Sequence, residues 1–169
     1  WTDLPTYTVT YHANSATTGT VPAPQTKIQG IPLTLATNSG NLARTGYTFV
    51  GWNTQAGGSG TDYAEEATYT TDANLTFYAK WTVNEYTVSF NTQSGTGGTS
   101  SVTATFGSPM PAANAPTRTG YTFNGYWDAT SGGTQYYTSS MASARNWDKA
   151  ANTTLYARWT VNSYSIIFH

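Results

Sequence analysis

Few side chains in this sequence have the types and spacing needed for acid–base, nucleophilic or metal chemistry. The two histidines are His12 and His169. Each ends a similar alternating stretch, "YTVTYH" and "YSIIFH", so each is expected at the exposed end of a strand rather than as a catalytic base. There are no cysteines to act as nucleophiles, form disulfides or bind zinc. No catalytic residue is predicted.

Four carboxylates lie close together in the first half of the chain: Asp62, Glu65, Glu66 and Asp72. Such a group could carry out general acid–base chemistry or hold calcium. The corresponding stretch of the second half carries uncharged residues instead, among them Thr138 to Ser140. This difference favours a solvated loop and would confine any calcium site to the first half. The sequence leaves calcium open, and no cofactor or metal site is predicted.

Two further motifs have simple structural interpretations. The glycine-rich stretch "AGGSG", residues 56–60, lacks the Lys and Ser/Thr that follow in a phosphate-binding loop, so it is interpreted as a turn. Lys80 is the candidate for a Lys–Asn crosslink, but Arg158 replaces it in the second half and cannot do that chemistry. A crosslink is therefore not expected.

Aromatic side chains are better candidates for binding. Tyr47, Phe49, Tyr121 and Phe123 alternate with other residues and are interpreted as core. Rings beside the glycine turns could remain in water and stack on sugar faces. The candidate ligand-binding residues are Trp52, Tyr126, Trp127, Tyr136 and Tyr137. Packing in the core or in a hairpin is the alternative for all five.

The composition restricts the possible partners. Only 9% of the 169 residues are charged, against roughly 25% in ordinary soluble domains. With a net charge of −1 and no run of Lys or Arg, binding to nucleic acid is not expected. A signal peptide, a transmembrane run and a lipidation motif are not found, as expected of an internal piece of a longer protein. The uncharged, hydroxyl-rich surface suggests an extracellular protein.

An internal repeat organises the chain. "LTFYAKWTVNEYTVSF", residues 75–90, returns as "TTLYARWTVNSYSIIF", residues 153–168. The repeat predicts two complete modules, 7–81 and 86–159. Residues 1–6 are interpreted as the end of a preceding module and a linker, and residues 160–169 as a linker and the first strand of a further module. That last strand, 164–168, is expected to dock on the second module or on another chain, because an unpaired apolar strand seeks a sheet edge.

Each module is expected to be rich in strands. Period-two alternation predicts strands at Tyr7–His12, at residues 101–106, through Tyr47 and Tyr121, and at residues 154–159; a strand near Gln25–Gly30 is less clear. Gly51 and Gly125 interrupt their strands at the same point and predict bulges. Short helical segments are expected at Leu33–Thr37 and within residues 139–147. The linkers Thr82–Glu85 and Thr160–Ser163 are expected to be four residues long.

The ordered motifs "YTVxF/Y", "RTGYTFxGWNT", "GGSGxxY" and "LYAK/RW" closely resemble the InlB B-repeat family, also called the Listeria–Bacteroides repeat, over nearly all of both modules. The second module departs from the pattern at Tyr126-Trp127-Asp128, where a residue looks inserted after Gly125, and over residues 138–149. The resemblance implies a β-rich α+β fold: tandem β-grasp, ubiquitin-like modules with little helix. It also implies a non-catalytic role in secreted or wall-attached bacterial proteins.

The expected function is an elongated spacer or adhesin stalk at the bacterial surface, not an enzyme. The alternative is a module that binds carbohydrate or a host receptor through exposed aromatic residues. The expected partners are a glycan or a host surface protein, together with contacts between neighbouring repeats, and no membrane insertion is expected.

Overall fold

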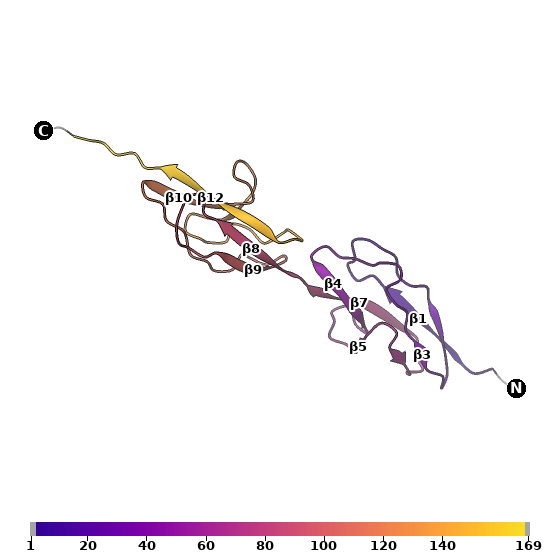
Figure 1. The fold of residues 1–169 in the computed structure, drawn as a ribbon. Coiled ribbons are helices and arrows are strands. Elements are labelled where there is room, and N and C mark those ends of the chain that lie inside the picture. The colour runs from indigo at the N-terminus through magenta and orange to yellow at the C-terminus, as the bar shows by residue number, and fades with distance from the viewer. Residues whose placement is uncertain (1–2, 168–169) are drawn as a thin grey trace. The chain divides into compact units, whose positions relative to one another are not determined.

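The computed structural model describes residues 3–167 and is built from strands, turns and loops (Figure 1). It forms two compact units that divide between Val83 and Asn84. The described residues contain no helix, and so no helix that is long and apolar enough to cross a membrane. The β-rich prediction is confirmed, whereas the helical part of the predicted α+β class has no counterpart in residues 3–167.

Unit one contains a five-stranded sheet in the order β2-β1-β7-β4-β5 and a separate two-stranded sheet, β3-β6. Its strands are β1 (Thr6–His12), β2 (Gln25–Ile28), β3 (Leu33–Thr34), β4 (Tyr47–Asn53), β5 (Asp62–Tyr63), β6 (Thr68–Tyr69) and β7 (Leu75–Val83).

Unit two is a five-stranded sheet in the order β11-β10-β12-β8-β9. Its strands are β8 (Glu85–Asn91), β9 (Ser101–Thr105), β10 (Tyr121–Trp127), β11 (Gln135–Tyr137) and β12 (Thr153–Val161). Matched strand by strand in chain order, the two five-stranded sheets have the same topology, as the internal repeat requires.

The first and last strands of each unit are parallel neighbours. Val9 of β1 pairs with Leu75 of β7, and Val88 of β8 pairs with Thr153 of β12. All other strand pairs in the two five-stranded sheets are antiparallel. The polypeptide therefore enters each sheet at one end of the central strand pair and leaves at the opposite end.

Aromatic residues fill both cores, because units of this size must bury much apolar surface with few residues. The buried apolar residues of unit one are Val9, Tyr11, Leu35, Leu42, Trp52, Tyr69, Phe77 and Ala79. Those of unit two are Val88, Ala104, Met110, Tyr126, Tyr136, Tyr137, Met141, Trp147, Leu155 and Ala157. Burial alternates along β1, as the period-two pattern predicts.

Both predicted bulges are present. The pairing of β4 with β7 shifts register between Phe49 and Gly51, and that of β10 with β12 shifts between Phe123 and Gly125. The two glycines have φ angles of 123° and 120°. A residue with a side chain rarely adopts this backbone conformation, so the bulge explains why glycine occupies both positions.

The two predicted helical segments are wrong. Leu33 and Thr34 form β3, which pairs with Thr68 and Tyr69 of β6. Residues 139–147 form a loop held by backbone hydrogen bonds such as Thr138 N to Ala142 O. This loop brings Trp147 into the core of unit two, and that tertiary contact overrides the weak local helix preference.

The boundaries of the long strands differ from the prediction. β7 continues to Val83 and β8 begins at Glu85, so strand residues occupy three of the four positions expected to form a linker. At the other end, residues 164–167 form no strand, and Tyr164 and Ile166 are 80% and 79% exposed. The expected docking of this segment on unit two is therefore not found in residues 164–167; Phe168 lies outside the described residues.

Candidate functional site

Four of the five aromatic candidates are core residues. Trp52 and Tyr126 occupy equivalent places, since Trp52 pairs with Ala79 of β7 and Tyr126 with Ala157 of β12. Both are fully buried. The Trp52 indole donates a hydrogen bond from Nε1 to the Ala36 carbonyl at 2.9 Å. Neither ring offers a face to a ligand in this conformation.

The register also corrects the apparent insertion after Gly125. Asn53 pairs with Tyr78, and Trp127 pairs with Tyr156, so Trp127 takes the place of Asn53 and no residue is inserted there.

Tyr136 and Tyr137 lie in β11 and are buried against the core of unit two. The Tyr136 hydroxyl donates to Asp148 Oδ1 at 2.5 Å, and the Tyr137 hydroxyl donates to the Pro111 carbonyl at 2.7 Å. Burial raises the pKa of the Tyr137 phenol to about 12, and burial, with the Asp148 hydrogen bond, also raises the pKa of Tyr136. The Tyr136 hydroxyl thus holds the loop after β11, and the Tyr137 hydroxyl holds the segment between β9 and β10.

Trp127 is the candidate that remains partly exposed. The Arg158 guanidinium lies over its ring, 4.5 Å from the centroid, and also donates to the Ala129 carbonyl at 3.1 Å and to the Gly132 carbonyl. The sequence comparison of Lys80 with Arg158 did not anticipate this stack. Arg158 thereby joins the glycine turn to the ring and leaves the remainder of the ring accessible.

A polar hollow of about 290 Å³ opens in unit one beside the glycine turn; it is lined by Asn14, Arg44, Asn53, Gln55, Ala56, Gly57, Gly58, Ala79, Lys80 and Trp81. Asn53 is its buried polar residue, 1% exposed. The Asn53 amide donates to the Gly60 carbonyl at 3.1 Å and accepts from Gln55 N at 2.8 Å. Because its polar atoms are already used to shape the turn, Asn53 is structural.

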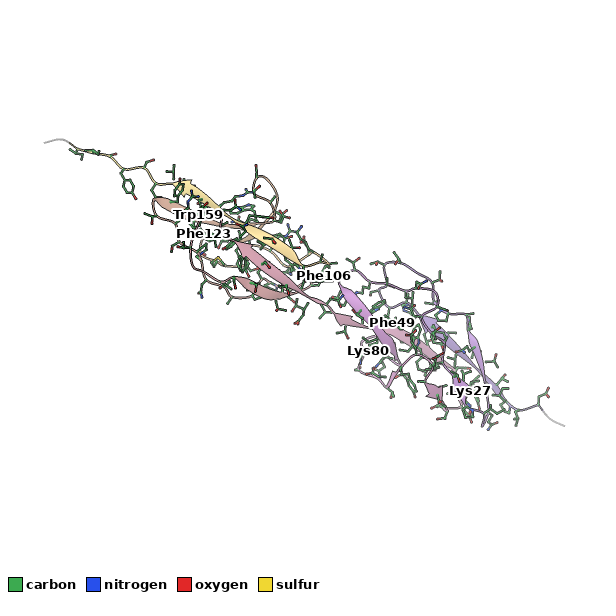
Figure 2. All side chains as sticks on the ribbon, viewed as in Figure 1. Lys27, Phe49, Lys80, Phe106, Phe123 and Trp159 are labelled. Carbon is green, nitrogen blue, oxygen red and sulfur yellow. The ribbon has the colours of Figure 1, made fainter. Side chains whose placement is uncertain are left out.

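Unit two has a related hollow of about 380 Å³, lined by Thr96, Pro116, Thr117, Arg118, Thr119, Tyr121, Phe123 and Trp159. Figure 2 shows Phe123 and Trp159 together here, and their ring centroids are 5.4 Å apart. Arg118 lies 3.7 Å over the Tyr121 ring, as Arg44 lies 3.8 Å over Tyr47 in unit one.

We call these two sites the Arg–Trp hollows, defined by Arg44 with Trp81 and by Arg118 with Trp159. Sequence reasoning did not select them as sites, although the signal was present as "RTGY" and "A-K/R-W" in both modules. A half-buried indole edge and a cation stacked on tyrosine suit polar, sugar-sized or anionic groups. Both indoles, however, also donate to loop carbonyls, Trp81 to Asn14 and Trp159 to Thr92, which is a structural role.

The clustered carboxylates of unit one have separate partners. Asp62 pairs with Lys80, and Asp72 pairs with Lys27 at 2.5 Å. Glu65 accepts from the Asn38 backbone N–H. No group of three or more His, Cys, Asp or Glu that could hold a metal occurs within residues 3–167.

The remaining titratable candidates are also held by neighbours. The His12 Nδ1 accepts from Asn14 N at 3.0 Å, at the exposed end of β1, while His169 lies outside the described residues. Lys80 is one-third exposed, whereas the side chain of Lys27 is fully buried, and Figure 2 shows the two lysines well apart in unit one. Sequence reasoning missed Lys27, whose equivalent in unit two is Ala104, because its partner Asp72 lies 45 residues away.

The Listeria-Bacteroides repeat domain matches this chain twice, over residues 7–80 and 86–158. The chain belongs to the Listeria-Bacteroides repeat family. The resemblance predicted from the motifs is therefore confirmed, with two tandem modules of the family.

Among the proteins similar to this chain, three match most of its length. The chain is 32% identical to a putative Gly-rich membrane protein of Evansella cellulosilytica over 96% of its own length, and 38% identical to Internalin H of Listeria monocytogenes serovar 1/2a over 69%. A putative membrane protein of Evansella cellulosilytica is 31% identical over 72%. The chain spans 19%, 20% and 17% of these relatives, respectively.

Proposed function

We propose that this chain is a non-catalytic repeat region that acts as an elongated spacer in a bacterial surface protein. The observation that carries the proposal is the parallel pairing of the first and last strands in each unit. Val9 aligns with Leu75, so Thr6 lies three positions before this point and Val83 eight positions beyond it. Entry and exit of unit one are thus separated by roughly 36 Å, at about 3.3 Å per residue, and each module would add that length to a stalk.

The connection between the modules supports the same proposal. Asn84 is the one residue between the end of β7 and the start of β8. A single residue spans less than about 4 Å of chain, so it restricts how far one module can fold back on the other. A stalk requires this kind of short connection.

The proposed location is the outside of the cell. The relatives are named as an internalin and as membrane proteins, and this chain corresponds to about a fifth of each. A surface with few charges and many hydroxyl and amide groups agrees with that location. The spacer would project other parts of a longer protein.

We also assign the modules to a β-grasp-like fold. Numbered in chain order within the five-stranded sheet, the strands of unit one lie in the order 2-1-5-3-4, with strands 1 and 5 parallel. This order supports the proposal. The segment that would hold a helix in a ubiquitin-like module contains β3 and irregular loop instead.

Small-angle X-ray scattering tests the spacer. We expect a maximum dimension of roughly twice the length of one unit, because two entry-to-exit distances of about 36 Å add along the chain. A compact particle with the two units side by side would contradict the proposal. A chain with three glycines inserted after Asn84 is the matched control, and it should give a broader distribution of distances.

A second candidate function is carbohydrate binding, favoured by the partly exposed Trp127 ring and by the two Arg–Trp hollows. A glycan array screened with the whole chain tests it. Selective binding should be lost in Trp127→Ala or Arg118→Ala and retained in Val50→Ala, which alters an exposed apolar residue of unit one, 48% exposed. Absence of binding by the unaltered chain would argue against this candidate.

A further inference from the structure

We propose that each unit is built to bear tension between its two ends, with the parallel strand pair as the element that resists extension. The inference rests on the pairs β1–β7 and β8–β12, which join the entry and exit strands of each unit directly. It deepens the proposed spacer role, because a stalk that projects another domain transmits whatever force acts on that domain.

The direction of loading follows from the topology. Tension pulls β1 toward its N-terminal end and β7 toward its C-terminal end, so the two strands are drawn past each other along their length. Four residue pairs, from Val9–Leu75 to His12–Tyr78, are then loaded together. In an antiparallel hairpin pulled from its open end, the same bonds would break one at a time, at a much lower force.

Unit two repeats this arrangement. Its four pairs run from Val88–Thr153 to Asn91–Tyr156. In both units, an asparagine just before the last strand adds one more hydrogen bond at the end of the parallel strand pair. Asn74 Oδ1 accepts from Thr8 N at 2.7 Å, and Asn152 Oδ1 accepts from Thr87 N at 2.9 Å. The same side-chain bond thus closes the loaded strand pair at the same end in both modules.

Additional contacts strengthen the pair in unit one. The hydroxyls of Thr10 and Thr76 are hydrogen-bonded across it at 2.9 Å. At its other end, the rings of His12 and Tyr78 lie 5.2 Å apart. These contacts join β1 to β7 through side chains, beside the backbone ladder.

The exit strand is anchored on its other side as well. β7 pairs with β4 along six positions, from Tyr47–Val83 to Asn53–Tyr78, and β12 pairs with β10 in the same way. Phe77 and Ala79 of β7 are also fully buried in the core. Force that reaches the exit strand is therefore shared by the sheet, and separation of β1 from β7 is the step that limits unfolding.

Single-molecule force spectroscopy of the whole chain tests the proposal. The native sequence has no cysteine, so a cysteine pair added by mutagenesis provides unique attachment points. Pulling through the chain ends should give two unfolding events, each releasing about 240 Å of chain at roughly 3.6 Å per residue. Pulling unit one through Thr8→Cys and Thr71→Cys, both exposed and both preceding the first residue pair Val9–Leu75, should unfold it at less than half that force. Equal forces in the two geometries would overturn the proposal.

A matched pair of variants separates mechanical from equilibrium stability. Asn74→Ala removes the bond to Thr8 and should lower the force of one of the two end-to-end events. Asn38→Ala removes two hydrogen bonds to the Leu42 backbone, at 2.7 and 3.0 Å, in a loop outside the loaded pair. It should lower the equilibrium stability of unit one without lowering the force, since forced unfolding depends on the unfolding barrier. If Asn38→Ala lowers the force as much as Asn74→Ala does, the strand pair is not the resisting element.

The force measurement and the scattering experiment can fail independently. An elongated chain with no difference between pulling directions would leave the spacer and remove the load-bearing role. A compact chain with strong directional resistance would remove the spacer and leave the mechanical property of each unit.

Discussion

Tyr126 and Tyr137 are neighbouring buried phenols, with ring centroids 6.4 Å apart, and they differ in what their hydroxyls contact. Tyr137 donates to the Pro111 carbonyl, whereas the buried Tyr126 hydroxyl has no hydrogen-bond partner among the described residues. Leaving a buried hydroxyl unpaired costs about 1–3 kcal/mol. Tyr126→Phe should therefore raise the free energy of unfolding of unit two by about 1 kcal/mol, as measured by urea denaturation.

The matched control is Tyr137→Phe, which should lower the stability because it removes a hydrogen bond. The pH adds a second criterion. Burial raises the pKa of Tyr126 to about 12 in the folded state, above the value of roughly 10 in the unfolded chain. The neutral phenol is thus favoured by folding, and stability is lost as the pH rises from 10 to 12. The advantage of Tyr126→Phe over the native chain should grow across that range; a constant difference would contradict this account.

The buried Lys27 gives a second prediction at this scale. Its side chain is 0% exposed and pairs with Asp72, whose oxygens also accept from Gly30 N. Asp72→Ala should destabilise unit one, because it leaves the buried Lys27 ammonium without its charged partner. The double variant Lys27→Met/Asp72→Ala should recover most of that loss. Hydrogen exchange of the unit-one amides in the whole chain measures both effects.

The same pair predicts sensitivity to acid. The Lys27 ammonium, with the Gly30 N–H, lowers the pKa of the Asp72 carboxyl below its ordinary value. A lowered folded-state pKa stabilises the fold above the ordinary carboxyl pKa, and that contribution is lost as the pH falls through the lowered value. The double variant should lose less protection at pH 2–4 than the native chain. An equal loss in both would exclude Asp72 as a source of the acid sensitivity.

Lys27 also explains why one strand was difficult to predict. Lys27 pairs with Tyr7 in β1–β2, and Ala104 pairs with Tyr86 in the equivalent place of unit two. A buried lysine breaks the apolar alternation that identified residues 101–106, so β2 was unclear while β9 was not. Periodicity cannot reveal a buried charge whose partner, Asp72, lies 45 residues away.

At the scale of elements, the bulges at Gly51 and Gly125 bring β4 and β10 close to the following edge strand. A Cβ added to Gly51 would lie 2.5 Å from the Tyr63 carbonyl oxygen, and one on Gly125 would meet the Tyr137 carbonyl oxygen. Gly51→Ala should destabilise unit one by more than about 1 kcal/mol, because the change adds backbone strain at positive φ to that clash. Heteronuclear NMR of the whole chain should show the unit-one amides losing protection while those of unit two keep it.

Gly57→Ala is the matched control, since a Cβ there meets nothing within 4 Å and its φ is not in the left-handed region. It should be close to neutral.

The predictions of strands and bulges are confirmed where local chemistry is sufficient, in the alternating strands and at the interrupting glycines. The predictions of short helical segments at Leu33–Thr37 and within residues 139–147 are wrong, because pairing with β6 and burial of Trp147 decide the conformation there. Such contacts join residues far apart in the chain and leave no local periodic signal.

At the scale of the whole molecule, the internal repeat predicted the number of modules, but the parallel pairing of the first and last strands was not predicted. Alternation shows which face of a strand is buried and does not specify its neighbour. For the same reason, the sequence pattern did not distinguish aromatic residues of the core from those of the surface. A ring beside a glycine turn can face either way, and packing by Tyr11 and Phe49 is what buries Trp52.

The two cores share no residue, so each half of the chain should fold alone. Fragments 1–83 and 84–169 divide the chain at the boundary of the compact units and leave every strand pair intact. At this size a core supplies only about 3–5 kcal/mol, so we expect cooperative but modest urea transitions for both. Circular dichroism and dispersed amide spectra measure this outcome. A fragment that stays unfolded alone but folds in the whole chain would show that its neighbour supplies part of its stability, and the modules would then not be independent units of a stalk.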